Sequence, residues 1–157
     1  MREMLRDRIS DALKTAMKEK NTVAVSTLRL ILTAVKDRDI AARSKGNDDG
    51  ISDADILQVF QTMIRQRHES IALYKQGGRQ ELADQEAKEI EVIESFLPCQ
   101  LDEAEMTAAI AAVIDETGAG SIKDMGKAMG ALRDRYAGQM DFGRASALLK
   151  AQLTARS

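Results

Sequence analysis

Few residues of this 157-residue chain have side chains that could do covalent or metal chemistry. His68 is the single histidine and Cys99 the single cysteine, so a histidine-rich metal site and an internal disulfide are excluded. A nucleophilic Cys–His pair would require these two residues to meet, and few chance pairs have that geometry. We therefore predict no catalytic residue, no metal site and no cofactor.

A row of carboxylates is the next candidate for chemistry, at three- and four-residue spacing: Glu86, Glu89, Glu91 and Glu94. Metal binding or acid–base catalysis would require them to converge on a pocket. We interpret most of them as a solvated helix face. One of them is expected to neutralise Arg67, which interrupts an apolar stripe and cannot be buried unpaired without a heavy desolvation cost. The sequence predicts an ion pair between Arg67 and Glu86 or, failing that, Glu89.

The helices that hold this pair follow from the apolar spacing. One stripe consists of Phe60, Ile64, Ile71 and Tyr74, and a second consists of Leu82, Ile90, Ile93 and Leu97. The glycines at 77–78 end the first helix, because glycine readily adopts the left-handed conformation at that position. A short turn makes the two helices antiparallel neighbours, so we predict a long helical hairpin.

Two features near the C-terminus suit a phosphate. Gly120 and Ser121 precede a predicted helix and would leave backbone N–H groups free for an anion, such as an RNA phosphate. The pattern G-A-G-S-I-K-D-M-G-K resembles a phosphate loop only loosely, because no strand precedes it.

Gly126 and Gly130 share a helix face, which predicts the close approach of another backbone.

Charge is distributed unevenly along the chain. Residues 1–45 hold 11 Lys/Arg and 6 Asp/Glu, residues 46–119 hold 5 and 16, and residues 120–157 hold 7 and 3. Two basic ends therefore flank an acidic middle, although the net charge is only −2. Solvated helix faces would explain this pattern. Two basic patches that contact phosphates would explain it as well.

The remaining segments also read as helices, so the fold class is all-α. Helices are predicted over 4–18, 23–42 (with Thr22 as N-cap), 53–76 and from Gly78 to Leu97, and three shorter helices follow Asp102, Ser121 and Asp141. Pro98 disfavours helical geometry before it. We predict an N-terminal antiparallel four-helix bundle in 1–97 and a small three-helix domain in 98–157.

No apolar run approaches the ~20 residues of a membrane span. The first residues lack the apolar core of a signal peptide. A single cysteine suits a reducing compartment. We therefore expect a cytoplasmic location and no membrane partner.

Several motifs together resemble the GatB/YqeY family. They are R-Q-R-H-E-S-I-x-x-Y-x-x-G-G-R-x-E-L, E-x-x-E-I, F-L-P-x-Q-L, S-I-K-D-M-G-K-A-M-G and D-F-G-R-A-S-A-L-L-K, which extend over nearly the whole chain. Phe96 stands where tyrosine is common in the family, and His68 stands where a basic residue is common.

The resemblance implies an all-helical protein whose C-terminal domain is similar to the tail of the B subunit of the tRNA-dependent amidotransferase, which helps to hold the tRNA. It also implies the family label of a carbon–nitrogen ligase with glutamine as amido-N-donor. The catalytic cradle of the B subunit has no counterpart in 157 residues. The chain is therefore expected to bind rather than to catalyse alone.

Our first functional hypothesis is a tRNA-binding accessory protein, without affinity for DNA, that works beside an aminoacyl-tRNA synthetase or amidotransferase subunits. The candidate contacts, with help from the basic N-terminus, are Ser121, Lys123, Lys127, Arg133, Arg135, Arg144 and Lys150. An alternative is a protein–protein adaptor that docks on such a subunit through the Met-rich, Gly-marked C-terminal helices. A stand-alone amidotransferase is the third possibility.

Overall fold

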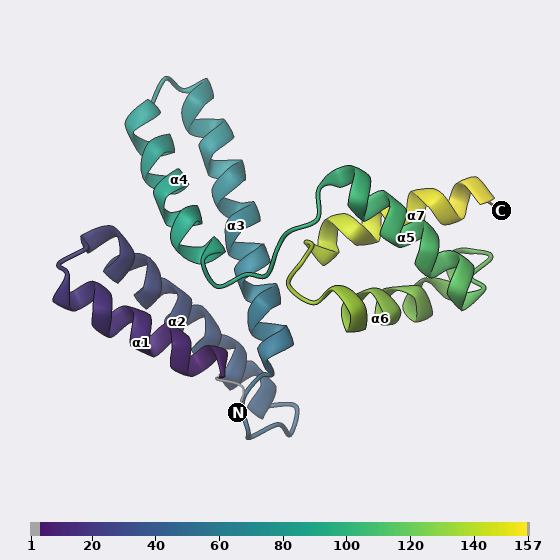
Figure 1. The fold of residues 1–157 in the computed structure, drawn as a ribbon, viewed down its shortest axis with the longest axis horizontal. Coiled ribbons are helices and arrows are strands. Elements are labelled where there is room, and N and C mark those ends of the chain that lie inside the picture. Colours follow the sequence, from purple (N-terminus) through teal and green to yellow (C-terminus); the bar gives the residue numbers. More distant parts are fainter. Residues whose placement is uncertain (1–3, 157) are drawn as a thin grey trace. The chain divides into compact units, whose positions relative to one another are not determined.

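The computed structural model describes residues 4–156, which contain seven α-helices, one short 3₁₀ helix and no strand. The prediction of an all-α fold is therefore confirmed. The elements are α1 (Leu5–Lys18), α2 (Thr22–Arg43), α3 (Asp53–Gln76), α4 (Gln80–Glu94), α5 (Glu103–Thr117), η1 (Ile122–Asp124), α6 (Met125–Tyr136) and α7 (Phe142–Arg156) (Figure 1).

The chain divides into two compact units, Met1–Leu97 and Pro98–Ser157. The division falls at Pro98, which cannot donate a backbone hydrogen bond to the preceding turn. Each unit has its own cluster of buried apolar side chains. Each unit is therefore a small helical body with a core of its own.

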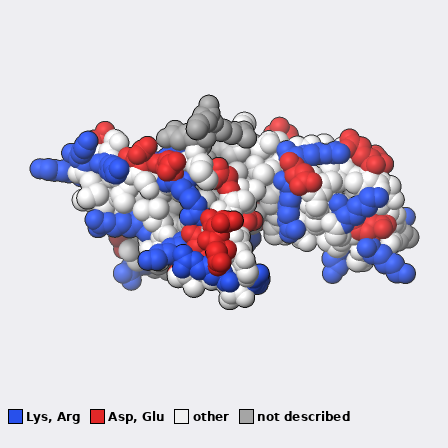
Figure 2. Space-filling view, turned by 90° about the horizontal axis from the view of Figure 1, so that it is seen from below, with Lys and Arg blue, Asp and Glu red and all other residues white. Residues whose placement is uncertain are grey.

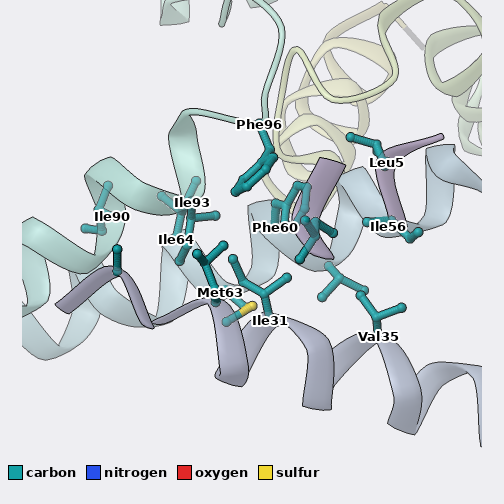
Figure 3. Packing of buried hydrophobic residues seen from close by; sticks show 14 of the residues in the cluster. Leu5, Ile31, Val35, Ile56, Phe60, Met63, Ile64, Ile90, Ile93 and Phe96 are labelled. Atoms are coloured by element: carbon teal, nitrogen blue, oxygen red, sulfur yellow. The ribbon is translucent and has the colours of Figure 1, made fainter. Parts of the chain in front are cut away.

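The first unit contains two helix pairs, α1 with α2 and α3 with α4, and α2 also packs against α4. The two pairs cross at an angle (Figure 1). Phe60 and Phe96 pack together in the core with their ring centroids 5.7 Å apart (Figure 3). Burying each ring stabilises the unit by roughly 2–3 kcal/mol before entropy is counted.

Leu5, Ile9, Leu13 and Met17 recur every four residues, which predicts one buried stripe on α1, but its last residue lies outside the core. Met17 is 52% exposed, and Ala16 is buried in its place. Residues four apart advance by about 400° around a helix, so each step rotates the stripe by roughly 40°. After three steps from Leu5 the rotation is about 120°, and Met17 has turned away from the buried side.

The start of α2 also differs from the prediction. Asn21, and not Thr22, is the N-cap, and its side chain accepts a hydrogen bond from the backbone N–H of Ala24 at 3.2 Å. Thr22 is the first helical residue. Both residue types cap helices well, so the sequence alone did not decide between adjacent candidates.

The turn between α3 and α4 has the hydrogen bonds of a Schellman motif. Gly78 has φ 72°, its N–H donates to the carbonyl of Lys75 at 3.2 Å, and the N–H of Arg79 donates to that of Tyr74 at 2.8 Å. The left-handed conformation costs a glycine almost nothing. This turn reverses the chain within three residues and sets α4 against α3.

Sequence reasoning missed a polar cluster that ties α1, α2 and the following loop together. Two Arg6 nitrogens donate to the Asp39 carboxylate at 2.7 and 2.9 Å, and Nη2 also donates to the carbonyl of Ile51 at 3.0 Å. The Ile51 N–H donates to Asp39 at 2.9 Å. Hydrogen bonding from Arg6, with help from Ile51, lowers the pKa of Asp39 to about 2. No spacing rule connects residues so distant in sequence.

The second unit packs α5 against α6 and α7. The sequence Asp102-Glu103-Ala104-Glu105 predicts a capping box at the start of α5, and this box is present. Asp102 accepts from the N–H of Glu105, and Glu105 accepts from the N–H of Asp102. Three methionines, Met106, Met129 and Met140, are buried in the core. The fourth methionine of this unit, Met125, is half-buried, so most of these side chains contribute to the interior.

We expect Asp39→Asn to lower the free energy of unfolding by about 1–2 kcal/mol at pH 7, since the variant loses the charge that holds Arg6. The pKa of Asp39 is lowered from 3.8 to about 2, so its contribution is fully present above pH 4. It is lost as the pH falls through 2. Urea unfolding at pH 7, 4 and 2 measures the difference.

Asp37→Asn is the matched control, because Asp37 is an exposed residue of the same helix. Its effect should stay within about 0.5 kcal/mol at every pH. Equal effects of the two substitutions at pH 7 would contradict the stabilising role of the Arg6–Asp39 pair.

Candidate functional site

Arg67 of α3 lies inside the hairpin, with its side chain 12% exposed. Its Nε is 3.4 Å from a carboxylate oxygen of Glu89 and 4.0 Å from one of Glu86, both on α4. Its Nη1 donates to the carbonyl of Met63 at 3.2 Å. The structure thus places the guanidinium beside both carboxylates that the sequence offers, and Glu89 is the nearer.

The two carboxylates are not equivalent. Burial raises the pKa of Glu86, the negative charge of Glu89 raises it further, and Arg67 opposes both effects. Arg67 is the one guanidinium that faces both carboxylates. Keeping Glu86 ionised beside Glu89 therefore costs free energy of folding. Glu89 is therefore the structural partner, and Glu86 is a partly desolvated charge beside it.

The second unit pairs several of its arginines with carboxylates of α5. Arg135 bonds to Glu116, Arg144 to Glu103 at 2.6 Å, and Arg156 to Asp115 at 2.9 Å. These pairs are exposed, so each stabilises the unit by at most about 1 kcal/mol. They nevertheless neutralise Arg135 and Arg144, two of the candidate RNA contacts. Figure 2 shows the result as cationic and anionic side chains interspersed on the surface.

The other candidate cations are exposed and have no ion pair in residues 4–156: Lys123, Lys127, Arg133 and Lys150. Three of them flank one face. Lys123 belongs to η1, and Lys127 and Arg133 lie on the side of α6 away from the buried Ala128 and Leu132. We call the surface formed by Lys123, Gly126, Lys127, Gly130 and Arg133 the α6 face. It also carries one carboxylate, Asp134.

Gly126 and Gly130 lie on this face without a neighbouring backbone. A Cβ built on either residue meets no heavy atom within 4 Å in the described chain. The predicted close approach is therefore wrong as a contact within the protein. Helix-destabilising glycines remain on an open surface, where internal packing does not require them.

The predicted anion site before η1 is already occupied by the chain itself. The N–H of Gly120 donates to the carboxylate of Asp124 at 2.9 Å. Asp124 takes the place of the phosphate, so the expectation of a free N–H at Gly120 is wrong. Ser121 makes no side-chain capping bond and is half-buried. The spacing from 120 to 124 is the signal that could have indicated this local bond.

The residues suited to covalent or metal chemistry do not gather in the described chain. His68 and Cys99 are both exposed, and they belong to different units. Within residues 4–156, no three His, Cys, Asp or Glu side chains are placed to hold a metal ion. In that same range, no helix has the length and apolar character required to cross a membrane.

A hollow of about 310 Å³ lies in the first unit between α1, the start of α2 and the end of α4. Its lining is mostly small or apolar, with Ala16, Leu28 and Phe96 among its residues. Glu19 is the one ionisable residue in the lining. Any proton transfer to a molecule bound in this hollow would therefore depend on Glu19.

The fold and this surface define a class: an all-helical protein of two small units with a cationic helix face on the second. A family model described as Yqey-like protein matches residues 6–153. The chain therefore belongs to the Yqey-like protein family.

Among curated proteins, the chain is similar to several named "Altered inheritance of mitochondria protein 41, mitochondrial". It is 31% identical to that of Kluyveromyces lactis over 54% of this chain and 43% of the relative. The match in Lachancea thermotolerans is 31% identical over 66% and 54%, and that in Candida glabrata is 34% identical over 54% and 45%. The chain spans about half the length of the curated relatives it matches.

These names contradict the expected cytoplasmic location, because they place the relatives in mitochondria. The expectation was derived from one cysteine and from the lack of long apolar runs. Such features describe a reducing, aqueous environment and do not distinguish between compartments of that kind.

We expect Glu89→Gln to destabilise the protein by about 2 kcal/mol at pH 7, since it leaves Arg67 with the more distant carboxylate. Glu86→Gln should be neutral or slightly stabilising. The pKa of Glu86 is raised by burial, so its ionised form costs stability above that pKa, and the cost disappears as the pH falls through it. Urea unfolding of both variants between pH 4 and 8 tests this asymmetry. A larger loss for Glu86→Gln would reverse the assignment.

Gly126→Ala and Gly130→Ala should each raise the free energy of unfolding by about 0.5–1 kcal/mol, because both glycines are helical and a methyl group meets open space. Thermal unfolding monitored by circular dichroism measures the gain. Gly78→Ala is the control, and it should destabilise because φ is 72° there. A loss of stability on placing alanine at 126 or 130 would mean that the α6 face has a packing role.

Proposed function

We propose that the chain binds tRNA through the α6 face, as an accessory protein related to the tRNA-dependent glutamine amidotransferase. One observation carries the proposal: Lys123, Lys127 and Arg133 are exposed and have no ion pair in residues 4–156, whereas Arg135 and Arg144 are held by carboxylates of α5. Unpaired cations can neutralise phosphates without first breaking an ion pair.

The shape of the α6 face supports a backbone contact with the nucleic acid. At Gly126 and Gly130 the helix surface carries no side chain, so a sugar–phosphate strand could lie close to the helix between the lysines and Arg133. Aromatic stacking is not available there, because Phe142 is buried and Tyr136 is half-buried. Recognition would depend on charge and shape, with little sequence specificity.

The motif S-I-K-D-M-G-K-A-M-G, on which part of the resemblance to the amidotransferase tail rests, contains both lysines and both glycines of this face. In that enzyme the tail helps to hold the tRNA. The chain would deliver or retain tRNA for a partner such as an aminoacyl-tRNA synthetase or an amidotransferase subunit. The carbon–nitrogen ligase label would then describe the partner's chemistry, and this chain would act by binding.

Filter binding of unfractionated tRNA to the full chain tests the proposal. At about 50 mM salt we expect measurable binding whose logarithm falls with the logarithm of salt with a slope of about −2 to −3, as three phosphate contacts would give. Lys123→Glu/Lys127→Glu should weaken binding by at least about tenfold and make the slope shallower by about 1–2.

Lys75→Glu/Lys88→Glu is the matched control, because it changes net charge equally at exposed positions in the first unit. It should leave affinity within about twofold, since these two lysines belong to the first unit and are not part of the α6 face. If both double variants lost the same tRNA affinity, net charge alone would explain the loss, and the α6 face would not be the binding site. Undetectable binding by the unaltered chain would overturn the proposal.

A further inference from the structure

The outward face of α2 has the spacing of a coiled-coil seam. Exposed residues follow one another at alternating four- and three-residue steps over most of the helix: Ser26, Leu30, Thr33, Asp37, Ile40 and Ser44. Leu30 is 47% exposed and Ile40 is 52% exposed. Steps of this kind keep residues on one line of a helix, where a second helix can pack. Within the described residues 4–97, no other element covers this line.

A row of cations runs along one edge of the seam. Arg29, Lys36 and Arg43 are seven residues apart and exposed, and none forms an ion pair in the described chain. The opposite edge has Ala34 and Ala41. In heptad terms the seam occupies the a and d positions and the cations occupy every g position, which selects a partner by charge.

We propose that this face of α2 docks an acidic amphipathic helix of another protein. The partner would place aliphatic side chains on Leu30 and Ile40 and acidic side chains against Arg29, Lys36 and Arg43. Asp37 lies in the middle of the seam, so the partner needs a cation or an amide opposite it. A single polar residue at such a position fixes the register of a helix pair.

The residues of this face disfavour two other partners, a second copy of the chain and a nucleic acid. Antiparallel pairing of α2 with a second copy would bring two rows of cations together, and parallel pairing would set them against alanines. A nucleic acid would leave Leu30 and Ile40 in water. An acidic helix satisfies the aliphatic residues and the cations together.

The test uses the full chain and a fluorescent 21-residue synthetic helix with leucine at a and d, glutamate at e and g, and one lysine placed to meet Asp37. Fluorescence anisotropy should detect binding that weakens as salt rises. The same peptide with lysine in place of every glutamate should bind at least about tenfold more weakly. Equal binding of the two peptides would overturn the proposal.

Two variants and one control locate the contact. Leu30→Ser/Ile40→Ser and Arg29→Glu/Lys36→Glu/Arg43→Glu should each weaken peptide binding by at least about tenfold. All five residues are exposed. Because the charge of Arg43 helps to lower the pKa of Asp39, urea unfolding of the triple variant is used to check that its fold is retained. Leu73→Ser removes an aliphatic side chain that is 67% exposed on α3, and it should leave binding unchanged.

Two further measurements decide between occupants. Light scattering should give the same mass for the unaltered chain and for Leu30→Ser/Ile40→Ser, and a dimer lost in the variant would assign the face to a second copy. The Arg29→Glu/Lys36→Glu/Arg43→Glu variant should bind tRNA within about threefold of the unaltered chain at moderate salt. A loss as large as that of Lys123→Glu/Lys127→Glu would assign the face to RNA and overturn the proposal.

Discussion

A guanidinium withdrawn from water between two helices needs a carboxylate, and the hairpin of α3 and α4 is built around that need. Arg67 marks the point beyond which large apolar side chains are no longer fully buried: Tyr74 and Leu82 are half-buried and Leu73 is exposed. The outer hairpin therefore depends on the acids that face Arg67, on the buried Ala83 and on the Schellman turn. Toward the base of the hairpin, ordinary apolar packing around Phe60 takes over.

Most of the helices could be predicted from capping residues and apolar spacing, and the predictions that were wrong also have causes within a few residues of the site concerned. The bounds of α3 and the capping box of α5 follow from cap residues and from apolar spacing. The predicted burial of Met17 was wrong because a strict four-residue repeat drifts around the helix, which has 3.6 residues per turn. The N–H of Gly120 is not free for an anion, as had been predicted, because it donates to the carboxylate of Asp124, four residues later. In each case a second local rule outweighed the one that had been applied.

The charged surface was less predictable, because the neutralisation of a cation is a tertiary property. The basic segment 120–157 meets its counter-charges on α5, which lies outside that segment in sequence. The Arg6–Asp39 contact joins residues on different helices, and no spacing rule points to it. A single sequence shows which charges exist, but only the packing of α5 against α6 and α7 shows which of them are left for a partner.

The pairing of arginines with α5 has a consequence for how the second unit would meet a polyanion. Residues 98–157 contain seven Lys/Arg and eight Asp/Glu, so the unit is nearly neutral as a whole. Arg135, Arg144 and Arg156 are paired with carboxylates of α5, and Asp124 and Asp134 lie among the cations of η1 and α6. Long-range attraction of this unit to a polyanion would therefore be weak. Affinity would be gained at close range, through the cations that have no ion pair in residues 98–156.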